Sequence, residues 1–234
     1  MLTLQNLKNQ WVHADLHNPG LLEGMAATAA DVFTRYGITS DLVIAHLMAQ
    51  MSVETGGGVA LMENLGAYTS QRLLQVFPKY FTATTAQQAA GHEVTVGQIA
   101  YGGRLGNDKA PSTDGFVYRG AGLIQLTGKQ WRIDLQKVLD SHGGTFNLVS
   151  TPGSLVDPAH ALESAAAFFV AAGCIPFAQN DCGDHVSYKV NGGFNGLPQR
   201  RAQLAIWKKE LGVAPIATPA PCPKIPKMPT PPPA

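Results

Sequence analysis

SDLVIAHLMAQMSVETGGG, residues 40–58, is the stretch of this 234-residue chain that decides its fold. Residues 41–54 are apolar nearly all round, which is typical of a helix buried at the centre of a domain. Ser40 is a suitable N-cap, because its hydroxyl can accept a hydrogen bond from a free amide of the first turn. The glycines at 56–58 end the helix and let the chain reverse. The sequence therefore predicts a buried central helix that ends close to a carboxylate, Glu54.

Several other segments place apolar residues at helical spacing. They predict helices over 21–36, from 70 to a stop before Pro78, over 127–141, from Pro158 to 173, and from 198 to 212. Asp157 and Pro158 are interpreted as an N-cap followed by proline at the first helical position. No stretch alternates well enough between apolar and polar residues to predict a strand. The predicted fold class is all-α, with long loops over 102–122 and 173–184 of the kind that is usually functional.

Composition excludes several classes of protein. Lys and Arg total 17 and Asp and Glu 16, so the net charge of +1 gives no electrostatic case for nucleic-acid binding. No apolar run approaches the roughly 20 residues that a membrane span needs. The first residues show no secretory signal, and the three cysteines are odd in number and late in the chain. We therefore predict no disulfide framework, and a soluble protein made in a reducing cytosol.

Proline divides the chain into a body, 1–213, and a tail, 214–234. From Pro215 to Ala234, nine of the 20 residues are proline. Such a segment forms few regular hydrogen bonds and buries no core, so we predict that it is polyproline II-like or disordered. The favoured interpretation is a linker or solubilising end. A partner-binding PxxP-type segment is the alternative.

No metal or cofactor site is predicted from the sequence. The seven histidines include no pair with the spacing of a metalloprotease helix, and there is no CxxC. Cys182 lies near His185 in the sequence, but no third positioned group completes a catalytic set. We interpret Cys182 as a thiol without a catalytic role.

The glutamates are more informative than the histidines. Glu23, Glu163 and Glu210 lie in amphipathic helices and are interpreted as solvated faces, and Glu93 is placed in a polar loop. Glu54 differs, because partial burial and the negative end of the helix dipole both raise the pKa of a carboxyl group, as a general acid requires. The alternative is a helix-end residue that only reaches solvent.

Glu63 follows Glu54 by nine residues. On one continuous helix, nine residues rise about 13.5 Å and turn about 900°, so the two carboxylates would point to opposite faces. The glycines at 56–58 let the chain fold back instead, so that Glu63 can face Glu54 across a groove. Two facing carboxylates are the minimum requirement for glycoside hydrolysis. The alternative for Glu63 is a loop residue that only caps a neighbouring backbone.

Four motifs occur in one order along the chain: VETGGG at 53–58, MENL at 62–65, GFVYRGAGLIQLTG at 115–128 and VNGGFNGLPQR at 190–200. Together they resemble glycoside hydrolase family 19, and more closely its branch of bacteriophage endolysins and bacterial chitinase-like lysins than the plant chitinases. The resemblance covers residues 21–213. It implies an α-helical, two-lobed, lysozyme-like domain with a sugar-binding cleft between the lobes.

The resemblance also implies roles for individual residues. Glu54 matches the general acid, Glu63 the general base, and Thr127 the hydroxyl that holds the attacking water. Gln125 and Asn191 match cleft residues that hydrogen-bond the N-acetyl and hydroxyl groups of sugars. Arg200 matches an arginine that supports the catalytic carboxylates, and Arg201 is the alternative alignment.

We therefore predict an endolysin-type glycosidase, active as a monomer, that cleaves β-1,4 bonds of peptidoglycan glycan strands by an inverting mechanism. It would be made in the bacterial cytoplasm and reach the periplasmic cell wall through a holin-type pore or another route, with no stable membrane insertion and no cofactor. The alternatives are a chitinase acting on N-acetylglucosamine polymers and a lytic transglycosylase. A non-catalytic wall-binding module would not need Glu54, Glu63 and Thr127. A toxin delivered to rival bacteria would use the same chemistry.

Overall fold

The computed structural model describes residues 1–214 and 222–223, and within them the protein is helical. Two isolated β-bridges, Met62–Ala121 and Ala121–Leu126, are the only extended pairing in the described residues. The α-helices are α1 Leu4–Gln10, α2 Ala14–His17, α3 Leu21–Arg35, α4 Asp41–Thr55, α5 Ser70–Val76, α6 Ala83–Ala89, α7 Glu93–Tyr101, α8 Asp114–Val117, α9 Lys129–Ser141, α10 Ala161–Ala171, α11 Ile175–Gln179, α12 Gly183–Asn191 and α13 Leu197–Glu210. Two 3-10 helices, η1 Leu65–Ala67 and η2 Pro152–Leu155, complete the set, so the all-α prediction is confirmed.

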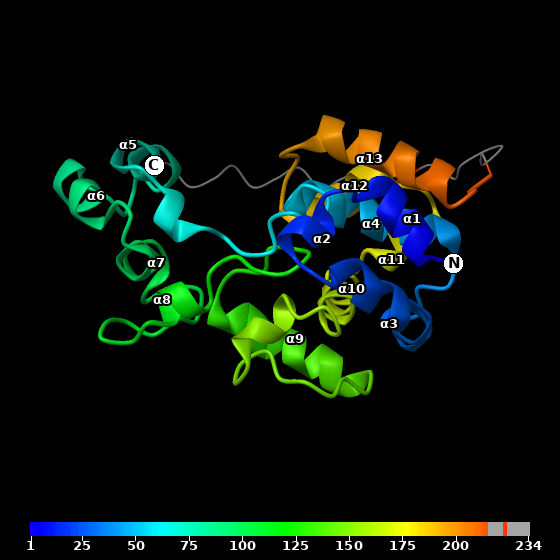
Figure 1. Ribbon diagram of the computed structural model, residues 1–234, viewed down its shortest axis with the longest axis horizontal. Coiled ribbons are helices and arrows are strands. Elements are labelled where there is room, and N and C mark those ends of the chain that lie inside the picture. Colours follow the sequence, from blue (N-terminus) through cyan, green and yellow to red (C-terminus); the bar gives the residue numbers. More distant parts are fainter. Residues whose placement is uncertain (215–221, 224–234) are drawn as a thin grey trace.

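The helices form two lobes, each with its own hydrophobic core. Helices α5 to α8 lie together at one end of the molecule, set apart from the other helices (Figure 1). The smaller core belongs to this group and includes Leu65, Leu73 and Phe77. The larger core gathers side chains from α1, α3, α4, α9, α10 and α13. The segment that follows α4 links the lobes, as the cyan ribbon of Figure 1 shows.

Helix α4 is the buried centre of the large lobe, as its apolar sequence predicts. The Ser40 hydroxyl caps it by accepting a hydrogen bond from the amide of Val43. Near the other end, the Ser52 hydroxyl accepts two indole N–H groups at 2.8 Å, from Trp11 after α1 and from Trp207 in α13. These bonds satisfy two buried indole donors at one acceptor and fix both helices against α4.

Several details of the predicted elements are wrong. Helix α10 begins at Ala161 rather than Pro158, because the Asp157 carboxylate closes a turn by accepting from the amide of Ala159. The predicted loops 102–122 and 173–184 contain the short helices α8 and α11, and Glu93 opens α7 instead of lying in a loop. Glu163 does not face solvent: its carboxylate is buried and pairs with Arg35 at 2.6 Å.

The interpretation of Cys182 as a thiol is also wrong, and the described residues hold one disulfide where no disulfide framework is predicted. Cys182, directly before α12, is bonded to Cys222, with the two Cα atoms 5.6 Å apart, and Cys174 is the free, buried thiol. The bond joins positions separated by 40 residues, a range over which sequence spacing gives no pairing signal. The predicted character of the tail falls on residues 215–221 and 224–234, which lie outside the described residues.

Among the described residues, no helix is both long enough and apolar enough to cross a bilayer.

Candidate active site

Glu54 lies in the last turn of α4 and is held by a guanidinium group. Arg200 Nη2 donates to Glu54 Oε1 at 2.6 Å, and Arg200 Nη1 donates to Gln50 Oε1 at 2.6 Å. Its Nε donates to the backbone carbonyl of Asn195 at 3.1 Å. The Arg200 side chain is only 4% exposed and that of Glu54 19%, so the pair is largely removed from water.

Arg200 reaches Glu54 because of how α13 begins. Gly196 adopts a left-handed conformation with φ of 68° and forms the N-cap, and proline occupies the first turn at 198. The first turn then points Arg200 at the end of α4. The neighbouring Arg201, the alternative in the sequence alignment, is exposed and pairs with Asp184 at 2.6 Å. The guanidinium group of Arg200 therefore neutralises the charge of the Glu54 carboxylate and fixes its position at the end of α4.

Glu63 lies on the segment that joins the lobes, and backbone bonds fix it there. Its amide donates to the carbonyl of Gly120 at 2.8 Å, and Arg119 Nε donates to the Glu63 carbonyl at 3.1 Å. The glycines at 56, 57 and 58 have φ of 60°, 72° and 78°, a left-handed run that turns the chain back after α4. The reversal after α4 that the sequence predicts is therefore observed.

Two tyrosines from the small lobe hold the Glu63 carboxylate. The Tyr68 hydroxyl donates to Oε1 at 3.1 Å, and the Tyr101 hydroxyl lies 3.1 Å from both Oε1 and Oε2. The Gly120 amide adds a longer contact to Oε2 at 3.3 Å. Neither tyrosine is among the residues predicted from the sequence, because they lie 33 positions apart and share no local motif. A local signal exists for one of them, because Tyr101 brings a polar hydroxyl group to the end of an apolar helix, α7.

Burial keeps both phenols protonated. Burial, followed by the negative charge of Glu63, raises the pKa of Tyr68 to about 12 and shifts the pKa of Tyr101 upward as well. Both hydroxyl groups therefore remain hydrogen-bond donors at neutral and acidic pH. Unlike Arg200, they bring no charge of their own.

Gln125 and Thr127 meet Glu63 around Gly120. A Cβ atom placed on Gly120 would lie 3.3 Å from both Gln125 Oε1 and Thr127 Oγ1 and 3.5 Å from Glu63 Cβ. Thr127 does not cap the next helix, because Gly128 is the N-cap of α9. Its hydroxyl donates to the Gln125 carbonyl at 3.2 Å and keeps lone pairs to accept from a water.

Gln125 is held in an unusual backbone conformation. Its φ is 52°, in the left-handed region that residues other than glycine rarely adopt. Its amide nitrogen donates to the carbonyls of Ala60 and Gly122 at 2.9 and 3.1 Å, which ties the loop down. Strained backbone of this kind concentrates at functional sites. Because the side-chain N–H groups of Gln125 bond to loop carbonyls, its side-chain oxygen is the atom directed toward the space around Gly120.

Asn191 lines a hollow that also includes Gln125 and Thr127, the residues beside Gly120. The hollow has a volume of roughly 450 Å³, and Gln125, Thr127, Trp131, Lys189 and Asn191 are among the residues that line it. Asn191 ends α12, where Gly192 with φ of 68° stops the helix. The Asn191 Nδ2 atom is buried and has no hydrogen-bond partner among the described residues. An orphaned amide donor next to this hollow suits a ligand acceptor such as a sugar carbonyl.

The candidate residues thus fall into two groups. Glu63, Gln125 and Thr127 surround Gly120, and Asn191 shares their hollow, whereas Glu54 and Arg200 form a separate pair in the large lobe. Within the described residues, Glu54 and Glu63 share no hydrogen-bond partner. Two carboxylates with independent surroundings can take different protonation states, as acid and base chemistry requires.

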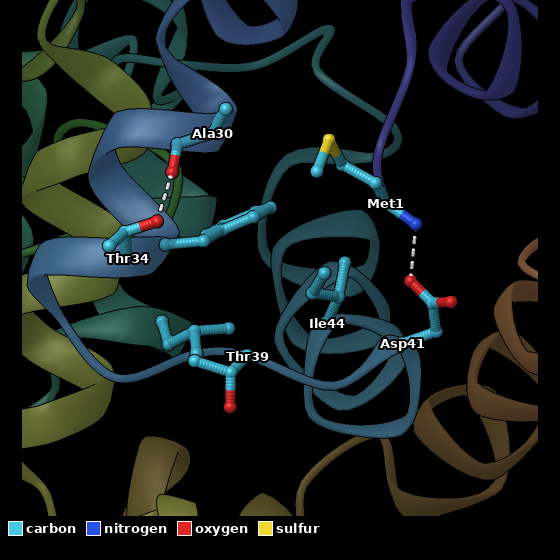
Figure 2. Close-up of a pocket in the computed structure, with 8 residues that line it drawn as sticks. Met1, Ala30, Thr34, Thr39, Asp41 and Ile44 are labelled. Atoms are coloured by element: carbon cyan, nitrogen blue, oxygen red, sulfur yellow. Dashed lines mark hydrogen bonds and ion pairs between the residues drawn. The ribbon is translucent and has the colours of Figure 1, made fainter.

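A second hollow, of roughly 370 Å³, lies between α3 and the start of α4. Figure 2 shows its lining, with the amino group of Met1 bonded to Asp41 and the Thr34 hydroxyl bonded to the carbonyl of Ala30. None of the candidate residues lines it, and its only carboxylate, Asp41, is occupied by the terminal amine. It is therefore not part of the candidate active site.

Comparisons with known proteins agree with this description. A Haemophilus influenzae protein described as a glycosyl hydrolase family 19 domain-containing protein is 30% identical over 183 residues, which is 78% of this chain and 86% of that protein. No family model matches the chain.

Solved structures share the fold. Chitinase C from Streptomyces griseus has a TM-score of 0.54 at 17% identity, covering 90% of this chain and 92% of that one. A bacterial family 19 chitinase has a TM-score of 0.57 at 15% identity, covering 92% of this chain and 97% of that one. At these identities the likeness shows the two-lobed helical fold alone.

Proposed function

The chain belongs to glycosyl hydrolase family 19 and is a glycosidase, and from this premise we propose that it cleaves β-1,4 bonds of bacterial peptidoglycan by an inverting acid/base mechanism. The observation that carries the proposal is the pair of glutamates in contrasting surroundings. Glu54 is held by Arg200, and Glu63 by two neutral phenols beside the Thr127 hydroxyl. One carboxyl group can then act as acid while the other acts as base.

In the proposed reaction, Glu54 donates its proton to the oxygen of the leaving sugar. Arg200 stabilises the carboxylate that this donation leaves, so the ion pair is strongest after the proton has moved. Glu63 takes a proton from a water that the Thr127 hydroxyl orients, and that water attacks the anomeric carbon from the opposite face. The tyrosines hold Glu63 in the orientation that this step needs.

The hollow beside Glu63 supports binding of an acetamido sugar. The oxygen of Gln125 can accept from a sugar N–H or O–H, and the unpaired donor of Asn191 can bond a sugar oxygen. Trp131 is 49% exposed on the same hollow and offers an apolar face to a sugar ring.

Lys189 favours peptidoglycan over chitin as the substrate. Its side chain is exposed, lines the hollow and has no carboxylate partner among the described residues. Peptidoglycan carries carboxylates on its lactyl groups and peptides, whereas chitin is neutral, so only peptidoglycan would gain from this cation. This substrate would place the activity at the bacterial cell wall. The monomeric state and the route to the wall stay predictions from the sequence.

The test is turnover of purified peptidoglycan beside chitin oligomers, with mass analysis of the products. We expect disaccharide-peptide fragments with ordinary reducing ends. A Lys189→Gln variant should lose turnover of peptidoglycan and not of any chitin oligomer that the enzyme cleaves. Cleavage of chitin with intact peptidoglycan would identify a chitinase, and 1,6-anhydro ends would identify a lytic transglycosylase.

A further inference from the structure

A second group of chemically active side chains lies at the start of α12. Cys182 directly precedes the helix, His185 is in its first turn, and Cys222 comes from the C-terminal segment. One imidazole nitrogen and both sulfur atoms lie within 4.8 Å of one another. None of the three residues lines the hollow that holds Gln125, Thr127 and Asn191. The cluster is therefore separate from the candidate active site.

The His185 side chain is buried beside the disulfide. It stacks on Phe177 with ring centroids 4.9 Å apart and is only 7% exposed. Its Nε2 atom is buried without a hydrogen-bond partner among the described residues. A buried, unpaired polar nitrogen is costly and calls for an explanation, such as a ligand that is bound in another state of the protein.

We propose that reduction of the Cys182–Cys222 bond converts this cluster into a binding site for a thiophilic divalent cation of the zinc class, with two thiolates and the His185 imidazole as ligands. Two sulfurs and one imidazole nitrogen are the donor types that zinc prefers. The three ligand atoms lie within 4.8 Å of one another, so once reduction lets the two sulfurs separate, all three are within reach of one tetrahedral cation. The disulfide and the metal site use the same sulfurs and exclude each other.

The chemistry balances with a dithiol as reductant. Its thiolate attacks the sulfur of Cys222, which is the exposed partner, and Cys182 leaves as a thiolate. The second thiol of the reductant then releases Cys222 and forms the reductant's own disulfide, so two electrons have passed to the protein. Cys182 is a favourable leaving group, because the start of the nine-residue helix α12 stabilises negative charge. Metal binding sends the remaining thiol protons to solvent.

Cys174 supplies a matched control. It is the free thiol of the described residues, it is buried, and it lies outside the cluster. Burial raises the pKa of its thiol to about 12, which makes it a poor metal ligand at neutral pH. Replacing Cys174 removes a cysteine without touching the proposed site.

The experiment titrates the full chain with Co²⁺, used as a spectroscopic substitute for Zn²⁺. The protein is reduced with dithiothreitol, freed of reductant under nitrogen, and titrated beside oxidised protein, Cys222→Ser and Cys174→Ala. We expect reduced wild-type and Cys174→Ala to bind a single equivalent, with near-ultraviolet thiolate-to-cobalt absorption that Zn²⁺ abolishes. Oxidised protein and Cys222→Ser should lose that absorption. Because Cys222 is exposed, its serine variant should fold.

Absence of the thiolate absorption in reduced, folded wild-type protein would overturn the proposal and leave the pair as a disulfide only. Equal absorption in Cys222→Ser would overturn it as well. Hydrolysis is not measured in this experiment, so failure of the metal site leaves the proposed glycosidase mechanism untouched, and the reverse also holds.

Discussion

Glu54 and Glu63 lie nine positions apart in the chain, but the protein holds them in opposite ways. Glu54 ends a helix of the large lobe, and a buried guanidinium group pairs with it at 2.6 Å. Glu63 lies on the connecting segment, where two neutral phenols from the small lobe hold its carboxylate at 3.1 Å. Glu54 is therefore paired with a positive charge, whereas Glu63 is oriented by neutral hydrogen-bond donors.

This contrast fits the two jobs of an acid/base pair. A group that gives up a proton ends as an anion, and a fixed cation beside it stabilises that product. A group that must accept a proton would become a weaker base beside such a cation, whereas neutral donors disturb it less. In the proposed mechanism the acid therefore lies in the large lobe and the base at the boundary with the small lobe.

The largest effects are expected when each carboxylate is neutralised in turn, which tests whether both glutamates transfer protons. Glu54→Gln and Glu63→Gln should each lower peptidoglycan hydrolysis by about 10²–10⁴, because each removes one proton-transfer group. Glu54→Gln should also lower the free energy of unfolding by about 1–3 kcal/mol, since it leaves a buried guanidinium without its anion. Glu63→Gln should cost less, because its amide oxygen still accepts from the tyrosines. Near wild-type hydrolysis by a folded variant would remove that glutamate from the mechanism.

The neighbouring arginines Arg200 and Arg201 test whether burial sets the contribution of an ion pair to stability. Arg200→Met should lower the free energy of unfolding by about 3–5 kcal/mol, because it breaks a buried ion pair. Arg201→Met should cost far less, because its pair with Asp184 is exposed to solvent. Urea unfolding of both variants measures the difference. Equal costs would show that Arg200 is not the residue that anchors Glu54.

The sequence was a better guide to the long helices than to the short ones. The periodicity of α3 and α4 and the capping of α4 by Ser40 are local signals, and the structure confirms them. Short helices were missed in both lobes, α6 and α7 in the small lobe and α1, α2 and α12 in the large lobe, because each spans too few residues for a clear period. The contribution of the small lobe to the site, two tyrosines on one carboxylate, depends on contacts between distant positions.

The resemblance to known motifs located Glu54, Glu63, Gln125, Thr127, Asn191 and Arg200, and the structure shows what surrounds each of them. Local spacing could not distinguish Arg200 from Arg201, because adjacent helix positions differ only in the direction that packing gives them. The disulfide to Cys222 could not be predicted either, because an odd number of cysteines leaves the pairing open.

Removing the hydroxyl groups of Tyr68 and Tyr101 should have a smaller effect and tests whether these neutral donors orient Glu63. Tyr101→Phe should lower hydrolysis by about ten- to a hundredfold, since it removes a donor worth about 1.5–3 kcal/mol to a charged acceptor. Tyr68→Phe should do less, because Tyr68 contacts one oxygen and Tyr101 lies against both. Hydrolysis by the two folded variants measures these effects. Wild-type rates in both variants would show that the tyrosines do not orient Glu63 for the reaction.

The smallest expected effect is a pH dependence of stability in the large lobe. Burial lowers the pKa of His46 in α4 below its ordinary value, even though Asp181 accepts from it and opposes the shift. The unfolded chain therefore takes up a proton near pH 6.5 that the folded protein does not, and the free energy of unfolding falls as pH drops below that value. The slope should not exceed about 1.4 kcal/mol per pH unit.

Urea unfolding at pH 7 and pH 5 measures this slope. A His46→Gln variant should lose the part of the pH dependence that wild-type protein shows between these values. Equal slopes in the two proteins would mean that His46 does not titrate as its burial requires.

The stereochemistry of the product tests the division of labour between Glu54 and Glu63 most directly. If Glu63 activates a water, the reaction is a single displacement that converts a β-glycoside into an α-anomer. Early-time proton NMR on a soluble peptidoglycan oligosaccharide, read before mutarotation, should show the α-anomer first. Initial β-anomer would contradict this assignment, because it requires a covalent or substrate-assisted intermediate, and a 1,6-anhydro product would show that Glu63 is not a base.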